Sequence, residues 1–260
     1  LSAQGFVTRA GQFANATLAP VNALLRALAG ADIDIFLLQR HSVIDHQVKE
    51  LIEKEGVTQV LELACGLSPR GYRLKQAYPQ LRYIEGDLPG MAARKKALLE
   101  EIGLVDGHEV RECNILNADG PASIGALLSE LDPTQPTLII TEGLVNYFPL
   151  AVISDFWRKL ASALSAFPQG TYLTDNYPLY KGMPFYRTLK VLGNMLGTVS
   201  RSQVGFHFHS DMEAIDHFHN LGFQQLAIHN PADYYGKLPI PKTRSNPMVR
   251  IMEGTVGKDQ

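Results

Sequence analysis

The stretch Val57-Thr-Gln-Val-Leu-Glu-Leu-Ala-Cys-Gly-Leu-Ser-Pro-Arg-Gly71 decides the fold of this chain. Its residues 60–63 predict a buried strand, because valine is β-branched and leucine is apolar. The small residues Ala64 and Gly66 then leave room for a ligand, and Pro69 can open a helix. Ligands bind beyond the carboxyl ends of the strands of a parallel sheet, so this turn is the first candidate site.

Two carboxylates accompany the turn. Glu62 lies inside the strand pattern, and Asp87 closes the next apolar run, 21 residues after Gly66. A separation of about 20 residues is typical of an acid that binds ribose hydroxyls. The dinucleotide fingerprint needs three glycines, whereas this turn has only Gly66 and Gly71. The pattern therefore predicts an adenosine-bearing cofactor and favours S-adenosylmethionine over NAD.

Several blocks of the sequence carry a resemblance to known proteins. Residues 60–66 resemble the first motif of class I S-adenosylmethionine-dependent methyltransferases, with Ala64 and Ser68 where that motif usually has glycines. Four blocks, in family order, resemble the leucine carboxyl methyltransferase family, which includes O-methyltransferases of polyketide pathways. They are Arg40-His-Ser-Val-Ile-Asp45, Cys65-Gly-Leu-Ser-Pro-Arg70 with Tyr72-Arg-Leu74, Glu85-Gly-Asp-Leu-Pro89 and Thr141-Glu-Gly-Leu-Val-Asn-Tyr147.

The order of apolar patterns predicts an α/β fold with a three-layer, Rossmann-like sheet. Strands are expected at 59–63, 81–85, 109–113, 137–141 and 171–174, with helices at 42–55, 69–77, 90–102, 121–131 and 150–167 between or before them. This alternation predicts a parallel sheet. After a helix at 210–221, strands at 223–228 and 248–253 have no helix between them. An antiparallel hairpin at the end of a seven-stranded, mostly parallel sheet resembles class I methyltransferases and does not suit a dinucleotide-binding dehydrogenase.

Length and composition limit the other possibilities. A chain of 260 residues fits a single domain, for which we expect an N-terminal helical cover (1–55), a core (56–260) and a substrate lid inserted at about 176–209. The net charge of −2 gives no basic field for nucleic acid. No apolar run reaches the ~18 residues of a membrane span. Cys65 and Cys113 would end strands that are not neighbours, which predicts free thiols and a cytoplasmic protein.

The adenosine half of S-adenosylmethionine has candidate partners at the strand ends. Asp87 would bind the ribose hydroxyls, or alternatively cap the turn before Pro89. Leu88 and Ile115 would sandwich the adenine. Asn114 stands where the family usually has an acid, so it could contact the adenine edge or only form a strand-end turn.

The amino-acid half of the cofactor needs charged partners. The resemblance implies that the Arg40 guanidinium takes the carboxylate, although Arg40 could also be a solvated charge just before a helix. Glu142 would face the ammonium group, because a buried carboxylate without a partner is costly. Gly66 and Ala64 would let the backbone approach. Glu62 could hold the turn or a water near the cofactor.

Catalysis would depend mainly on holding the acceptor oxygen against the sulfonium methyl. A carboxylate acceptor needs no base, whereas a hydroxyl would need one, for which His207, His209 and Asp175 are candidates. The two histidines alternate with phenylalanines, so on an extended segment both would face one side. Tyr147 matches a tyrosine of the family. A metal site is not expected, because three or four converging ligands are needed.

The leading hypothesis is an S-adenosylmethionine-dependent O-methyltransferase that acts on a carboxylate or hydroxyl of a small-molecule acceptor. Two alternatives are a nicotinamide-dependent oxidoreductase and a non-catalytic cofactor-binding protein. The departures at Ala64, Ser68 and Asn114 favour the second of these. No feature of the residues indicates a nucleic-acid or membrane partner, and the oligomeric state is left open.

Overall fold

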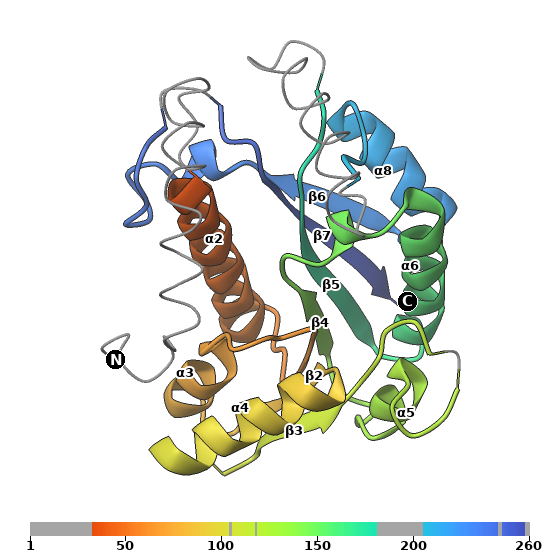
Figure 1. Ribbon diagram of the computed structural model, residues 1–260. Helices are drawn as coiled ribbons and strands as arrows, with labels where there is room; N and C mark the ends of the chain where they lie inside the picture. Colours follow the sequence, from red (N-terminus) through yellow and green to blue (C-terminus); the bar gives the residue numbers. More distant parts are fainter. Residues whose placement is uncertain (1–32, 104–105, 118, 181–204, 244–245, 258–260) are drawn as a thin grey trace.

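The computed structural model describes residues 33–103, 106–117, 119–180, 205–243 and 246–257 (Figure 1). Seven strands form one sheet in the order β3-β2-β1-β4-β5-β7-β6. The strands are β1 (Gln59–Leu63), β2 (Arg82–Asp87), β3 (His108–Glu112), β4 (Thr137–Thr141), β5 (Gln169–Asn176), β6 (Gln225–His229) and β7 (Arg250–Gly257). Pairs among β1 to β5 are parallel, and β7 is antiparallel to both β5 and β6. The predicted fold class is therefore confirmed.

Helices cover both faces of the sheet and complete the three layers (Figure 1). The helices α2 (Ile33–Lys54), α3 (Arg70–Ala77) and α4 (Pro89–Ile102) lie on one face. The other face carries α5 (Ile124–Ser129), α6 (Leu150–Leu164) and α8 (Asp211–Asn220). Two short 3₁₀ helices, η1 (Val145–Tyr147) and η2 (Pro231–Tyr234), follow β4 and β6. None of the described helices combines the length and apolarity that spanning a bilayer requires.

A separate apolar core fills each interface between sheet and helices. Trp157 of α6 is fully buried and contacts the rings of Phe208 and Phe218 on the α6–α8 face. On the α2 face, Val43 and Ile44 pack with the side chains of Leu138 and Ile140 on β4. All five residues of β1 and of β4 are buried, as expected of central parallel strands covered on both faces.

The strand order fixes where a ligand would bind. The chain moves outward from β1 to β2 and β3, then returns to β4 on the other side of β1. In an open α/β sheet the crevice at such a reversal, beyond the carboxyl ends of the strands, is the usual ligand site. The turn after β1 and the loop after β4 therefore border the candidate site.

Some boundaries differ from the predictions. Helix α2 begins at Ile33, not at residue 42, so Arg40 lies inside the helix and not before it. Strand β5 is longer than expected because Asp175 and Asn176 also pair with β7. Residues 1–32 of the predicted cover and 181–204 of the predicted lid lie outside the described residues. The division into cover, core and lid stays a prediction.

Candidate active site

The turn after β1 has an unusual backbone. Ala64 and Gly66 both have a φ of +53°, in the left-handed region that glycine adopts more easily than other residues. The space where a Cβ on Gly66 would point holds no atom within 4 Å. The Gly66 amide donates to Asp87 Oδ2 over 2.7 Å. This hydrogen bond ties the turn after β1 to the end of β2, with open space beside it.

Ala64 is the one position in this turn where the local geometry opposes the side chain. Ala64→Gly should raise the free energy of unfolding by about 0.5–1 kcal/mol, because relief of the left-handed strain exceeds the extra entropy of the unfolded chain. Urea unfolding measures the change. Ala97→Gly on the exposed side of α4 is the control and should cost about 1 kcal/mol. A loss of stability in both variants would contradict this explanation.

The residues predicted to contact the adenosine half of the cofactor lie at and just after the ends of β2 and β3. Asp87 Oδ1 also accepts from the amide of Leu88 over 2.7 Å, so the carboxylate is held by two backbone donors. Leu88 is 53% exposed although it is apolar. Ile115 packs partly against the core of the α6 face. Asn114 accepts from the Leu116 amide through its side-chain oxygen over 3.0 Å. This hydrogen bond forms a strand-end turn, which is one of the two roles that the sequence analysis considers for Asn114.

Arg40 lies among acids at the ends of β4 and β5. Its Nε donates to Glu142 Oε1 over 2.9 Å, and its Nη1 lies 3.3 Å from Asp175 Oδ2 and 3.4 Å from the Tyr177 hydroxyl. A Cβ on Gly143 would stand 3.2 Å from the guanidinium nitrogens, so glycine permits this approach. Burial raises the pKa of Asp175, although the charge of Arg40 acts in the opposite direction. From the sequence, Arg40 is expected to bind the carboxylate of the cofactor's amino-acid tail and Glu142 to face its ammonium group. In the structure these two side chains bind each other directly.

Arg70 is a further functional candidate, to which the sequence analysis assigns no role. It has no exposed surface and joins acids from three separate segments. Its Nε lies 2.6 Å from Asp45 Oδ1, its Nη1 lies 2.6 Å from Glu62 Oε1, and its Nη2 contacts Glu142. Burial alone would raise the pKa of Glu142, but Arg70, His41 and Arg40 hold it well below its usual value.

A second buried charge cluster lies beside the first. Glu62 and Glu85 face each other on neighbouring strands, and both are buried. Glu85 accepts from Lys95 Nζ over 2.7 Å and lies 2.8 Å from His108 Nε2. A Cβ on Gly71 would stand 2.7 Å from Glu85 Oε1, so α3 can approach the sheet only with glycine here.

A comparison with protein-family models adds the decisive observation. The family described as leucine carboxyl methyltransferase matches residues 5–160, which is more than half of the chain. The chain belongs to the leucine carboxyl methyltransferase family. The match covers Arg40, the turn after β1, Asp87 and Glu142, and so includes every residue predicted to hold the cofactor.

Curated relatives of this leucine carboxyl methyltransferase family member match only in part. A Frankia alni protein, provisionally named an S-adenosyl-L-methionine-dependent methyltransferase, is 33% identical over 141 residues, covering 54% of this chain and 44% of that protein. A similarly named Mycobacterium marinum protein is 37% identical over 97 residues, or 37% of this chain and 29% of that one. The chain thus spans less than half the length of these relatives.

Solved structures support the fold of this family member. A Thermobifida fusca protein, provisionally titled a methyltransferase, has a TM-score of 0.65 at 17% identity, covering 94% of this chain and 88% of that chain. PigF, whose structure contains SAH (S-adenosylhomocysteine), has a TM-score of 0.56 at 18% identity, with 88% and 64% covered. At these identities the similarity establishes the fold alone.

The predicted catalytic residues of this family member differ in exposure. Tyr147 in η1 is 56% exposed. His207 is buried, and its Nε2 lies 3.1 Å from the backbone oxygen of Val145. His209 is about half exposed and lies next to Glu213. The expectation that both imidazoles face one side is wrong, because Phe208 between them has a φ of +63° and breaks the extended segment.

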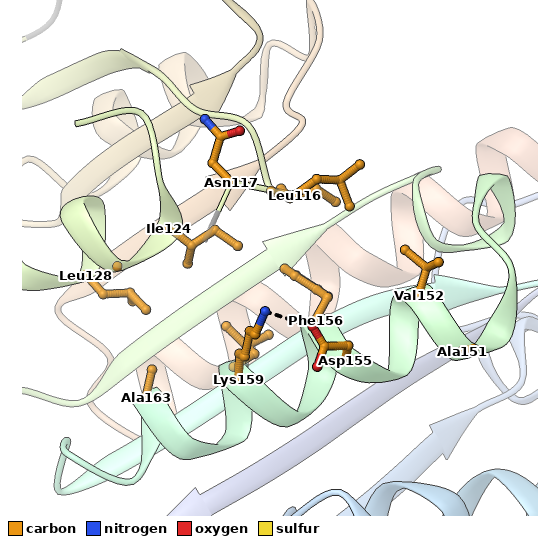
Figure 2. A pocket seen from close by; sticks show the side chains of 13 residues that line it. Leu116, Asn117, Ile124, Leu128, Ala151, Val152, Asp155, Phe156, Lys159 and Ala163 are labelled. Atoms are coloured by element: carbon orange, nitrogen blue, oxygen red, sulfur yellow. Dashed lines mark ion pairs between the residues drawn. The ribbon is translucent and has the colours of Figure 1, made fainter. Parts of the chain in front are cut away.

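A pocket of about 580 Å³ lies between α5, α6 and the loop after β3 (Figure 2). Its lining is mostly apolar and includes Ile115, Leu128 and Phe156, with the Asp155–Lys159 ion pair beside it. Of the residues predicted to bind the cofactor, Ile115 alone lines this pocket. Because α5 and α6 form its walls, the pocket lies on the opposite face of the sheet from α2 and Arg40. In the described part of the chain, no cluster of three or more potential ligands could hold a metal ion.

Proposed function

We propose that this chain is an S-adenosylmethionine-dependent O-methyltransferase that transfers a methyl group to a carboxylate or hydroxyl of a small-molecule acceptor. One observation carries the proposal. An acid fixed at the end of β2, Asp87, and a cation fixed over the end of β4, Arg40, lie on either side of the open turn after β1. S-adenosylmethionine has a ribose diol and an amino-acid tail that match these two groups.

The chemistry of the donors and acceptors fits this cofactor. The Asp87 carboxylate accepts one backbone hydrogen bond on each oxygen, and a carboxylate has about four acceptor sites, so it could still accept from ribose hydroxyls. The exposed Leu88 offers an apolar contact for adenine. Glu142 and Asp175 could face an ammonium group, and Arg40 a carboxylate. When bound, the cofactor supplies an electrophilic methyl group on a sulfonium.

Arg40 would have to divide its hydrogen bonds between the cofactor and its own acids. Its side chain is 16% exposed, whereas Arg70 has no exposed surface. Arg40 is therefore the guanidinium of this pair that a cofactor could reach. We assign Arg70 the separate role of holding Glu142, and through it Arg40, in place. On the acceptor side, exposure favours Tyr147 and His209 over the buried His207.

Isothermal titration and a methyl-transfer assay test the proposal. We expect S-adenosylmethionine and S-adenosylhomocysteine to bind, NAD not to bind, and labelled methyl to appear as an ester or ether of a small acceptor. Binding of NAD instead would favour the oxidoreductase alternative. Cofactor binding without turnover of any acceptor would favour a non-catalytic cofactor-binding protein.

A cytoplasmic location is part of the same proposal. Cys65 and Cys113 are both free and buried, and unpaired thiols are usual in reducing compartments. Burial raises the pKa of Cys113 to about 11 and that of Cys65 further. Neither thiol is therefore a candidate nucleophile.

A further inference from the structure

The pocket between α5 and α6 is not used by the proposed cofactor site, apart from its contact with Ile115. It has a volume of about 580 Å³ and extends along α6 from Ala151 to Ala163, which is about 18 Å at the rise of an α-helix. A second space of about 300 Å³ shares Leu128 and Ala163 with it and continues to Phe167. The two spaces together form an elongated hollow, which we name the α5–α6 groove.

The groove is open because its two helices differ in length and carry small residues. Helix α5 has 6 residues and α6 has 15, so α5 can cover only part of its neighbour. Gly125 on α5 and Ala163 on α6 leave space between the helices. The larger side chains of Ile124, Leu128 and Phe156 line this space (Figure 2). The walls of the groove are therefore apolar on both sides.

Two apolar side chains remain exposed where the groove reaches the ligand-binding edge of the sheet. Leu116, in the loop after β3, is 56% exposed, and Val152, in the first turn of α6, is 41% exposed. Both belong to the lining of the groove. Apolar surface that is left in water has a free-energy cost, which an apolar ligand would remove. An apolar space of this kind also holds water poorly and binds apolar molecules.

The described lining provides no buried hydrogen-bonding group that lacks a partner. Asp155 and Lys159 form an ion pair over 2.7 Å, so their charges compensate each other. Within the described ranges, none of the buried polar atoms without a hydrogen bond belongs to a residue of the groove. A sugar, a phosphate or an extended peptide needs such groups on the protein. This lining therefore suits a hydrocarbon.

We propose that the α5–α6 groove binds the straight hydrocarbon chain of an amphiphilic small molecule. A chain matches the elongated shape better than a compact ring does, because it can fill both connected spaces while its polar end stays in water. The volume of about 580 Å³ lies in the range of about 300–1,000 Å³ that is usual for small-molecule sites. Asp87, Arg40 and Glu142 take no part in the groove, so the inference goes beyond the proposed function.

Titration of the protein with the straight-chain primary alcohols hexanol, octanol and decanol, followed by NMR, tests the proposal. We expect the signals of Ile124, Leu128 and Phe156 to shift most. Each buried CH₂ should strengthen binding by about fourfold, so decanol should bind about fifteenfold more tightly than octanol. The protein is used without S-adenosylhomocysteine, so the result does not depend on the proposed function.

A variant that fills the groove supplies the second test. Ala163→Phe places a large side chain where the two spaces meet, and it should weaken decanol binding at least about tenfold. Ser162→Phe, at the exposed neighbouring position of α6 outside the groove, is the matched control and should bind decanol as the parent does. If Ala163→Phe does not fold, Gly125→Phe replaces it. A Cβ at Gly125 would stand 3.8 Å from Ser123 Oγ, which is an ordinary contact distance.

The proposal is overturned if affinity for the alcohols does not rise with chain length, or if the variant with the filled groove binds decanol as the parent does. It is also overturned if the parent is a dimer by light scattering, does not bind decanol, and becomes a monomer in Ala163→Phe. The groove would then be an interface between two copies of the chain.

Discussion

Arg70→Met should lower the free energy of unfolding by about 3–5 kcal/mol, the range for removing one partner of a buried ion pair. Arg70 is completely buried and joins Asp45, Glu62 and Glu142. Without the guanidinium, Glu62 would be left at 1% exposure, and its remaining partner among the described residues would be the Tyr83 hydroxyl, over 2.6 Å. Urea unfolding at neutral pH measures the loss.

The control for this variant is Arg158→Met, on the exposed surface of α6. It should change stability by less than about 0.5 kcal/mol. The difference between Arg70→Met and the parent should shrink as the pH falls, for two reasons. The acids left without a cation can then be protonated in the variant. The pKa of Glu142 is depressed in the folded parent, so the parent loses stability as the pH falls below the usual carboxyl range. A loss under about 1 kcal/mol at neutral pH would contradict the structural role of Arg70.

Asp87→Ala should weaken binding of S-adenosylmethionine by about 1.5–3 kcal/mol, the range for a hydrogen bond to a charged group. This corresponds to a loss of affinity of about ten- to more than a hundredfold. Asp87 would bind the ribose, and it also holds the Gly66 amide over 2.7 Å. Both the ligand contact and the shape of the turn therefore depend on one carboxylate. Isothermal titration measures the affinity.

Two further variants show which role dominates. Asp87→Asn keeps one oxygen that can accept from the Gly66 amide but removes the charge. We therefore expect its affinity for S-adenosylmethionine to lie between that of the parent and that of Asp87→Ala. Asp106→Ala, at an exposed acid, should bind the cofactor as the parent does. If Asp87→Ala also binds like the parent, the ribose assignment is wrong.

The apolar patterns of the sequence located the sheet well. Strands β1 and β4 have the predicted bounds, because fully buried parallel strands are continuous apolar runs between turn residues. Strand β5 extends further than predicted, since its last residues are polar. Asp175 and Asn176 are nonetheless buried there, the first beside Arg40 and the second bonded to Asn146. No local pattern marks polar residues that are satisfied by distant partners.

The charge cluster could be predicted only in part, for the same reason. Arg40, Glu62 and Glu142 were identified from their motifs, whereas the central place of Arg70 was not. Its partners Asp45, Glu62 and Glu142 come from α2, β1 and the end of β4. Only the fold brings these segments together. One feature of the sequence could have indicated Arg70. Each of its three acids lies in or next to a predicted strand or helix, and the fold brings these three elements to the same edge of the sheet.

The two histidines show the limit of reasoning from alternation. Alternating His and Phe at 206–209 is a strand-like pattern, but the positive φ of Phe208 turns the chain. His207 then enters the core against Trp157, while His209 stays outside. A left-handed phenylalanine carries no sequence signal, because such a conformation is rare for a bulky residue.

The central claim is that the cofactor lies across the ends of β1, β2 and β4, between Asp87 and Arg40. A crystal structure of the protein with S-adenosylhomocysteine tests it most directly. We expect density with the ribose on Asp87, the adenine against Leu88 and Ile115, and the amino-acid tail beside Arg40 and Glu142. Density for the ligand in the groove between α5 and α6 alone, or none at the turn after β1, would contradict the claim.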